Sequence, residues 1–413
     1  MKATFSPKRR RLWCHGPKPE YALDTDWADQ WYIGARTLPL VRPQKDGIVL
    51  PGGNRQTQEF AEFCIRILGL MPEQVLWTTG RNYLMDDDIR EELLVQIQRQ
   101  VKPGEWEIVP YSVTEPFLRW ATQIKAPILG DDEQWVRIHG NKGILHPNAI
   151  PQLRDPSLPL LPEEVAGIRL PWGYTCTNKE ELIIACDLLQ AAGVEKFVLK
   201  PAVGTTGEGI LVINTKNQIT GYAFPMGAVV LEECLPIDID AQGRNISPSI
   251  QYLGQKLLGS VTDQTFKGTA HEGNIVPSAT SREFQKELLE MAKRMILWLK
   301  PQGPGGFDFL SVQGEAVLVD PNVGRFTGAH PAKIFRALHA PRMPFACWKI
   351  DPTKELGAFW DELNTLGIAF TPFSNRTGIF PLCYLREMWG LLVAFGQNRK
   401  ELARLRTQAE ECL

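Results

Sequence analysis

The stretch Phe-Val-Leu-Lys-Pro-Ala-Val-Gly-Thr-Thr-Gly-Glu-Gly-Ile-Leu-Val-Ile occupies residues 197–213. Two apolar runs flank a loop that contains three glycines, and Lys200 closes the first run. Short apolar runs bounded by Gly and Pro are typical of buried strands. The stretch therefore predicts a strand, a Gly-rich loop and a second strand. A Walker A or dinucleotide-binding motif would place a helix after the loop.

The loop itself has the chemistry of a polyphosphate site. Gly204 and Gly207 allow the backbone N–H groups to approach an anion, while Thr205 and Thr206 add hydroxyl donors. Lys200 adds a compact positive charge. The alternative is a Gly-rich hairpin turn beside a surface lysine, and this stretch alone does not decide between them.

A second stretch, Gly-Phe-Asp-Phe-Leu-Ser-Val-Gln-Gly-Glu-Ala-Val-Leu-Val-Asp-Pro-Asn at 306–322, predicts a hairpin. With a loop over 313–315, Asp308 faces Asp320 across the ladder, and alternation puts Asn322 on the side of Asp320. Like charges directly opposed destabilise a strand pair, so this arrangement favours a bound hard cation such as Mg²⁺. The alternative is a pair of solvated acids at a strand end.

Bulk properties restrict the class of protein. The 413 residues predict two to four domains, and 44% hydrophobic with 22% charged residues is ordinary for a soluble globular protein. A net charge of −2 gives no general attraction to nucleic acid or membranes. Eight scattered cysteines without C-x-x-C pairs, no apolar leader and no long apolar run predict a reducing, cytoplasmic setting. The basic run at 8–11 is interpreted as a solvated end, with contact to an anionic partner as the alternative.

Strands and helices alternate in the first third of the chain. The patterns predict strands at 47–50, 75–77 and 106–109, and helices at 56–68 and 86–99, with a polar, extended segment before them. This alternation predicts a small doubly wound α/β domain over about 30–130. Gly52 and Gly53 follow a strand, where they form either a cleft lining or a plain tight turn.

The middle of the chain begins with a Pro-rich connection at 131–170, which is predicted to be irregular except for a short helix or turn at 141–145. Thr177 and Glu180 form a capping-box pattern that opens a helix to about residue 192. Strands are predicted at 228–231 and as a pair within 247–259. A polar loop at 265–274 carries Lys267 and His271, and an amphipathic helix at 281–299 follows.

In order and spacing, Lys200 with its loop, the strand into residues 232–235 and the hairpin acids resemble the ATP-grasp superfamily over about 140–335. The resemblance implies an α/β (α+β ATP-grasp) fold. Its expected parts are a Rossmann-like pre-ATP-grasp domain (1–130), a small subdomain with its linker (131–230), a large subdomain with the metal site (231–340) and a C-terminal extension (341–413).

The resemblance also implies roles for individual residues. Lys142 and Lys200 correspond to the lysines that hold the ATP phosphates, and Asp238 or Asp240 to the ribose contact. Arg325 corresponds to the arginine on the reacting phosphoryl group, although the Asn-Val-Gly-Arg spacing is one residue longer than usual. The remaining implied residues are the phosphate cover Gly204, Thr205, Thr206 and Gly207, the adenine hinge Glu232, Glu233, Cys234 and Leu235, and the ligands of two Mg²⁺ ions, Asp308, Asp320 and Asn322.

Both ends of the chain are similar to the pheganomycin-type peptide ligases, through residues 49–52, 76–79, 325–331 and 377–380. That resemblance implies an enzyme that joins a small-molecule carboxylate to an amine through an acyl phosphate, and a homodimer is one expected assembly. Lys267 and His271 are expected to face the acyl phosphate or the substrate, with a surface role as the alternative for His271. His330 is expected to contact a substrate carboxylate or to make a structural hydrogen bond. Other acceptors (a thiol, a hydroxyl or bicarbonate) and a non-catalytic nucleotide-binding module stay open.

Overall fold

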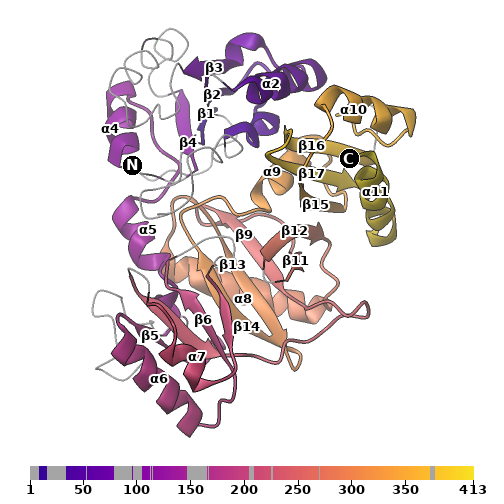
Figure 1. The fold of residues 1–413 in the computed structure, drawn as a ribbon. Coiled ribbons are helices and arrows are strands. Elements are labelled where there is room, and N and C mark those ends of the chain that lie inside the picture. The colour runs from indigo at the N-terminus through magenta and orange to yellow at the C-terminus, as the bar shows by residue number, and fades with distance from the viewer. Residues whose placement is uncertain are drawn as a thin grey trace.

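The structure is a computed structural model that describes residues 9–15, 34–52, 54–78, 95, 105–111, 113, 115–146, 165, 167–203, 209–224, 227–268, 270–372 and 377–413. These residues form three sheets: a four-stranded parallel sheet, a four-stranded antiparallel sheet and a nine-stranded antiparallel sheet (Figure 1). The mixed α/β architecture predicted from the sequence is confirmed. None of the helices within these ranges is both long and apolar enough to cross a bilayer.

The parallel sheet lies near the N-terminus and has the strand order β3-β2-β1-β4. Its strands and helices are β1 (Arg10–Cys14), β2 (Gly47–Pro51), β3 (Val75–Thr78), β4 (Trp106–Pro110), α2 (Arg55–Leu68), α4 (Glu115–Ile124) and the 3₁₀ turns η2 (Leu38–Leu40) and η3 (Pro72–Gln74). The three expected strands and the first helix are confirmed. The helix expected at 86–99 lies outside the described residues, apart from Val95, which is helical.

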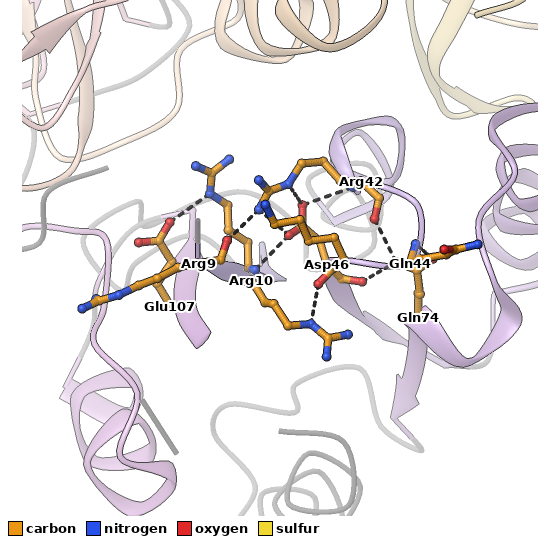
Figure 2. Close-up of polar contacts among 9 residues, drawn as sticks. Arg9, Arg10, Arg42, Gln44, Asp46, Gln74 and Glu107 are labelled. Atoms are coloured by element: carbon orange, nitrogen blue, oxygen red, sulfur yellow. Dashed lines mark hydrogen bonds and ion pairs between the residues drawn. The ribbon is translucent and has the colours of Figure 1, made fainter. Parts of the chain in front are cut away.

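The basic run near the start is not a solvated end, as far as it is described. Arg11 lies in β1, an inner strand of the sheet, and donates from Nε to Glu107 Oε1 at 2.9 Å. Asp46 accepts the backbone N–H of Arg11 and the side chain of Arg42 (Figure 2). The expectation was wrong because Leu-Trp-Cys, at 12–14, follows the arginines and makes the segment a buried strand. Arg10, the first residue of β1, is only half-buried, and its guanidinium lies over the ring of Trp106.

The smaller antiparallel sheet has the order β5-β8-β6-β7 and lies farthest from the parallel sheet (Figure 1). It contains the two strands predicted around the Gly-rich loop, which are confirmed. Its elements are β5 (Gly173–Cys176), α6 (Lys179–Ala191), β6 (Phe197–Pro201), β7 (Leu211–Ile213), α7 (Lys216–Thr220) and β8 (Val229–Glu233). Residues 204–208 of the loop lie outside the described residues.

Helix α6 begins one residue later than its predicted capping box. Its N-cap is Asn178, whose side chain accepts the backbone N–H of Glu181. Glu181, rather than Glu180, reaches back to the backbone N–H of Thr177. The shift follows from the high preference of Asn for the N-cap position.

The connection at 131–170 is more regular than expected. It contains helix α5 (Glu133–His139), capped by Asp132, and the 3₁₀ helix η4 (Lys142–Leu145), which confirms the short helix predicted at 141–145. Trp135 and His139 stack one turn apart on α5, with ring centroids 4.4 Å apart. The prolines that suggested irregular backbone lie beyond η4.

The nine-stranded sheet carries the rest of the chain in the order β14-β13-β9-β11-β12-β15-β17-β16, with β10 beside β9. Its strands are β9 (Pro248–Leu253), β10 (Lys256–Leu257), β11 (Thr262–Lys267), β12 (Ala270–Val276), β13 (Pro304–Val312), β14 (Glu315–Asn322), β15 (Phe345–Ile350), β16 (Gly378–Leu385) and β17 (Trp389–Phe395). The helices of this part are α8 (Arg282–Leu299), α9 (His330–His339), α10 (Leu356–Thr365) and α11 (Arg399–Cys412).

Two expectations about this sheet need comment. Residues 265–274 are not a loop, because β11 and β12 pair as an antiparallel hairpin. The C-terminal strands also continue the same sheet, since Ala346 of β15 pairs with Ile275 of β12. The expected division at residue 340 therefore cuts through one sheet, and the domain boundaries stay predictions.

The turn of the β13–β14 hairpin has two residues, Gln313 and Gly314, both with positive φ (55° and 79°). Val312 pairs directly with Glu315, so the turn is shorter than the loop expected at 313–315. Two positive φ values match the twist of the paired strands, which is why two-residue hairpins adopt this turn.

A bulge then restores the predicted pairing of the acids. Phe309 pairs with Leu318, and in that register Asp308 would face Val319. The register shifts between Asp308 and Phe309, so that Asp308 pairs with Asp320, as predicted. The bulge leaves Val319 out of the register between the two strands, and its backbone carbonyl accepts a hydrogen bond described below.

Asp238 holds the turn from outside the hairpin. Its carboxylate accepts the Ser311 hydroxyl at 2.7 Å and the backbone N–H groups of Gln313 and Gly314 at 2.9 and 2.8 Å. These hydrogen bonds, first that from Gly314, lower the pKa of Asp238. The carboxylate implied as a ribose contact therefore already has three donors in the hairpin.

We expect Asp238→Ala to lower the free energy of unfolding by about 1–3 kcal/mol, because three donors at the turn lose their acceptor. Denaturant unfolding measures this change, with Asp361→Ala on the exposed face of α10 as the control. Nucleotide binding is expected to be unchanged. A weaker nucleotide affinity without loss of stability would restore the ribose assignment.

Candidate active site

A cavity of about 510 Å³ lies where the two antiparallel sheets meet the N-terminal unit, which is the part of the chain from β1 to α4 that contains the parallel sheet. Its walls come from β6, β8, β9, β11–β14, β15 and β17, together with the segment after β14. It collects most of the residues predicted from the sequence: Lys142, Lys200, Glu232, Glu233, Cys234, Leu235, His271, Asp308, Asp320, Asn322 and Arg325.

Asp308 is fixed by neighbours on both sides of β13. Phe307 and Phe309 point into the core under α8, so alternation turns Asp308 to the cavity face. The Ser249 hydroxyl donates to Oδ1 at 2.6 Å, and Asn322 Nδ2 donates to Oδ2 at 2.7 Å. Burial, and then the charge of Asp320, raise the pKa of Asp308 to about 6.

Asp320 has an unused oxygen. Its Oδ1 is buried and has no hydrogen-bond partner, while Oδ2 lies 3.9 Å from Lys142 Nζ. A buried carboxylate oxygen without a donor is costly unless a cation binds it. The two aspartates and the Asn322 carbonyl oxygen are hard oxygen donors, so this set fits Mg²⁺.

Protein side chains alone do not complete the coordination shell of a metal ion here. Within the described ranges, no group of three or more His, Cys, Asp and Glu side chains is arranged to hold a metal ion. Mg²⁺ commonly binds through one or two carboxylates and completes its shell with waters and substrate phosphates. The site therefore fits an ion that arrives with a phosphorylated ligand.

Lys200 connects the small sheet to the hairpin. Its Nζ lies 2.6 Å from Glu232 Oε1 and donates to the bulged Val319 carbonyl at 3.0 Å. His146 Nε2 lies 3.1 Å from the other oxygen of Glu232. Burial would raise the pKa of Glu232, but Lys200 and His146 lower it by more, so the carboxylate stays ionised.

Glu232 was predicted as part of the adenine hinge, but its side chain forms ion pairs within the protein. Its side chain balances Lys200 and His146, while the residues that follow it, Glu233, Cys234 and Leu235, also line the cavity. Glu233 is tied by its side chain to the backbone of Trp172.

Arg325 reaches the hairpin in spite of the extra residue in its motif. Gly324 adopts φ 68°, and a Cβ there would meet Val136 at 2.2 Å. This tight turn brings Arg325 Nη2 to Asn322 Oδ1 at 2.5 Å. The longer spacing is thus absorbed by one glycine in the left-handed region.

Three other predicted residues have different positions. Lys267 is exposed at the end of β11 and does not line the cavity. His271 lines it, is contacted by Asn274 at 3.0 Å, and has its pKa lowered to about 4 by burial and then by Lys349. His330 is structural: Thr327 N–H donates to its Nδ1, and its Nε2 is 3.0 Å from the Tyr252 carbonyl.

The polar floor of the cavity was not predicted from the sequence. Ser247, directly before β9, and Ser249 and Gln251 within it alternate with buried apolar residues, and all three line the cavity. Gln264, on β11, lies beside them. The period-two polar pattern in an otherwise buried strand was the available signal. Gly204, Thr205, Thr206 and Gly207 lie outside the described residues, so their role stays a prediction.

We expect Asp308→Asn to stabilise the ligand-free protein at neutral pH. The pKa of Asp308 is higher in the folded than in the unfolded protein. Its ionisation therefore lowers the free energy of unfolding as the pH rises from about 4 to 6, and the full loss persists above pH 6. The variant should gain up to about 3 kcal/mol at pH 7.5 and nearly nothing at pH 3.5. Denaturant unfolding at both pH values, with Asp361→Asn as the control, measures this. If Asp308→Asn destabilised the protein equally at both pH values, the hydrogen bonds of Asp308 would outweigh its repulsion with Asp320.

No family model matches the chain, and no curated protein matches it significantly in sequence. Solved structures match it over nearly its whole length. An N5-carboxyaminoimidazole ribonucleotide synthetase in complex with ADP has a TM-score of 0.61 at 11% identity, over 99% of this chain and 98% of that one.

Two further structures agree. The N5-carboxyaminoimidazole ribonucleotide synthetase from Thermus thermophilus has a TM-score of 0.58 at 12% identity, over 98% of each chain. The biotin carboxylase domain of the Hydrogenobacter thermophilus 2-oxoglutarate carboxylase, crystallised with MgADP, ADP and bicarbonate, has a TM-score of 0.61 at 14% identity, over 98% of this chain and 90% of that one. At identities this low, the structural likeness shows the fold alone, and that fold is the α/β ATP-grasp fold expected from the sequence.

Proposed function

We propose that the protein is a Mg-ATP-dependent ligase that joins a carboxylate to an amine. One observation carries the proposal: two buried lysines, Lys142 and Lys200, lie in the same cavity as the hairpin set Asp308, Asp320 and Asn322. Cations on one wall and oxygen ligands on the other suit a triphosphate with its metal ions. Two of the similar structures are complexes with ADP or ATP.

The nucleotide would bind between the two antiparallel sheets. Val198, Ile210 and Leu310 give this part of the cavity apolar surfaces for a base, beside the backbone of residues 233–235. Lys142 and Lys200 would hold the phosphates, and the Gly-rich loop at 204–207 would cover them. Covering the phosphates excludes water, which would otherwise hydrolyse an acyl phosphate.

The metal ligands would act through charge. Bound Mg²⁺, two ions by the resemblance, would neutralise phosphate charge during phosphoryl transfer. Asp320 would present its unpartnered Oδ1, and Asp308 the carboxylate held by Ser249 and Asn322. Arg325 would donate to the transferred phosphoryl group from its place beside Asn322.

The reaction would occur in two steps. A substrate carboxylate oxygen attacks the γ-phosphorus, breaking the bond to ADP and forming an acyl phosphate. An amine then attacks the acyl carbon, expels phosphate, and loses a proton to give the amide. His271 would contact the substrate as a neutral side chain at physiological pH, because its pKa lies near 4. Lys267, exposed at the end of β11, is proposed only as a contact made when substrate is bound.

The identity of the carboxylate separates two candidates. The resemblance at the chain ends favours an amino acid or peptide-like carboxylate, as in the pheganomycin-type ligases, and we propose cytoplasmic action, with a homodimer as the expected assembly. The second candidate is carboxylation of an amine with bicarbonate. The similar biotin carboxylase domain favours it, because that structure is a complex with MgADP and bicarbonate. ADP release in a coupled assay discriminates: dependence on an organic carboxylate and an amine supports the first, and dependence on bicarbonate with an amine supports the second.

Two other outcomes have clear meanings. ADP release that requires a thiol or hydroxyl acceptor, without amide product, would exclude an amine acceptor. ATP binding without ADP release, whatever acceptor is supplied, would indicate a nucleotide-binding module without ligase activity.

We expect Asp320→Asn to reduce turnover by at least about 100-fold, because the metal ligand with the unpartnered oxygen loses its charge. Steady-state ADP release measures this, and unchanged thermal unfolding shows that the fold is intact. Asp361→Asn, on the exposed face of α10, is the matched control. Turnover near the wild-type rate would contradict the metal assignment.

We expect Lys200→Ala to raise the KM for ATP by about 10-fold or more, because a buried phosphate contact is lost. It also leaves Glu232 without its closest cation, so some loss of stability should accompany it. Lys216→Ala, an exposed lysine paired with Asp187, is the control. An unchanged KM would mean that Lys200 only supports the hairpin.

A further inference from the structure

The N-terminal sheet opens toward the same cavity at its strand-order reversal. β2 and β4 lie on opposite sides of β1, and all three strands are parallel. In such sheets, ligands bind beyond the carboxyl ends of the strands at this point. His15 follows β1 and Tyr111 follows β4, so both lie at that edge, and Tyr111 lines the cavity.

Arg36 lies at this edge with part of its guanidinium unused. The residue precedes η2, is only 7% exposed and lines the cavity. Its Nε and Nη2 atoms are buried and have no hydrogen-bond partner. Among the described residues, no carboxylate forms an ion pair with it. A buried cation that lacks both an ion pair and full hydrogen bonding is expensive, so its presence calls for a compensating anion.

The orientation of the guanidinium restricts the ligand. Cζ lies over the Tyr111 ring, 5.1 Å from the ring centroid, so the ring contacts the guanidinium without pairing its Nε or Nη2. Nε–H and one Nη2–H lie along one edge of a guanidinium and point the same way. Two parallel donors of this kind match the two oxygens of a carboxylate or phosphate.

His15 and Phe326 connect this edge to the hairpin. The His15 ring lies 4.6 Å from Phe326 and 5.9 Å from Tyr111, centroid to centroid. Burial, then the charges of Arg36 and His330, lower the pKa of His15, so it is uncharged and does not compete for the anion. Phe326 directly follows Arg325 in the chain and also lines the cavity.

We propose that Arg36, supported by Tyr111, is a binding site for an oxyanion group of the substrate, a carboxylate or a phosphate remote from the reacting end. The proposal rests on the proposed ligase function for its meaning: the reacting group lies near Arg325, and the second charge is held by the N-terminal unit. The substrate class is thus a small molecule with an anionic end besides its reacting amine or carboxylate.

The test is direct binding of probe anions to the full chain. Isothermal titration with succinate and with inorganic phosphate is done on the wild type and on Arg36→Gln, Arg36→Lys, Lys200→Ala and Arg404→Gln. Lys200→Ala removes a cation from the nucleotide half of the same cavity and detects phosphate bound there, and Arg404→Gln, which removes an exposed cation from α11, is the control. Each titration is repeated with saturating Mg-ADP.

With Mg-ADP saturating the nucleotide half of the cavity, we expect saturable binding of at least one anion, weakened tenfold or more in Arg36→Gln, less in Arg36→Lys, and unchanged in Arg404→Gln. Stronger binding of succinate would identify a carboxylate, and stronger binding of phosphate a phosphorylated substrate. Arg36→Gln should also raise the melting temperature without ligand, since it removes an unpaired buried charge. If Arg36→Gln does not fold, Arg36→Lys alone decides through its loss of the paired donors.

No saturable binding of either anion, or equal affinity in the wild type and the folded Arg36 variants, overturns the proposal. The Mg-ADP arm separates this failure from failure of the ligase function. Mg-ADP binding without an Arg36-dependent anion site defeats the inference alone. Arg36-dependent anion binding by a chain that binds no Mg-ADP defeats the nucleotide proposal and leaves the anion site in place.

Discussion

The repulsion between Asp308 and Asp320 is the constraint around which the cavity is built. The hairpin register places the two carboxylates directly opposite each other, and burial together with the charge of Asp320 raises the pKa of Asp308. The surrounding structure compensates in part, through Ser249 and Asn322 on Asp308 and the more distant Lys142 on Asp320. One buried oxygen of Asp320 remains without a donor. A site that keeps this cost in the ligand-free state is organised for a cation, because binding one removes both the repulsion and the unpaired oxygen.

The cations near the hairpin belong to different parts of the chain. Lys200 comes from the small sheet, Lys142 from the connection before it, and Arg325 from the turn after β14. Lys200 also joins the two sheets directly, since it contacts Glu232 in one and the bulged Val319 carbonyl in the other. Charge balance in the cavity thus depends on how the sheets are placed relative to each other, which links ligand binding to their packing.

The N-terminal unit adds a cation of another kind. Arg36 has no ion pair among the described residues, in contrast to Arg11, which is buried against Glu107 in the same unit. Both arginines are desolvated, but only Arg36 lines the cavity. The difference distinguishes a residue that holds the sheet together from one that is available to a ligand.

Local sequence was sufficient for the elements with a clear period and for the order in which they follow each other. The strands around Lys200, the helix at 281–299 and the facing of Asp308 and Asp320 were all predicted, because alternation and helical periodicity are short-range properties. The polyphosphate interpretation of the loop at 204–207 stays a prediction. The facing of the acids was predicted for the wrong reason, however: a shorter turn and a bulge at Val319 cancel each other.

The tertiary structure decided what each charged side chain contacts. Three charged side chains illustrate this: Arg11 in the parallel sheet, Asp238 at the hairpin turn and Glu232 beside Lys200. Each has at least one hydrogen-bond partner that lies 70 or more residues away in the chain. Arg36 carries no local pattern at all, and its unpaired nitrogens exist only because packing buries them beside Tyr111. The sequence by itself determined the strands, their order and the acids of the hairpin. Long-range packing alone determined which charges are neutralised within the protein and which remain for a ligand, because burial and pairing are properties of the assembled sheets.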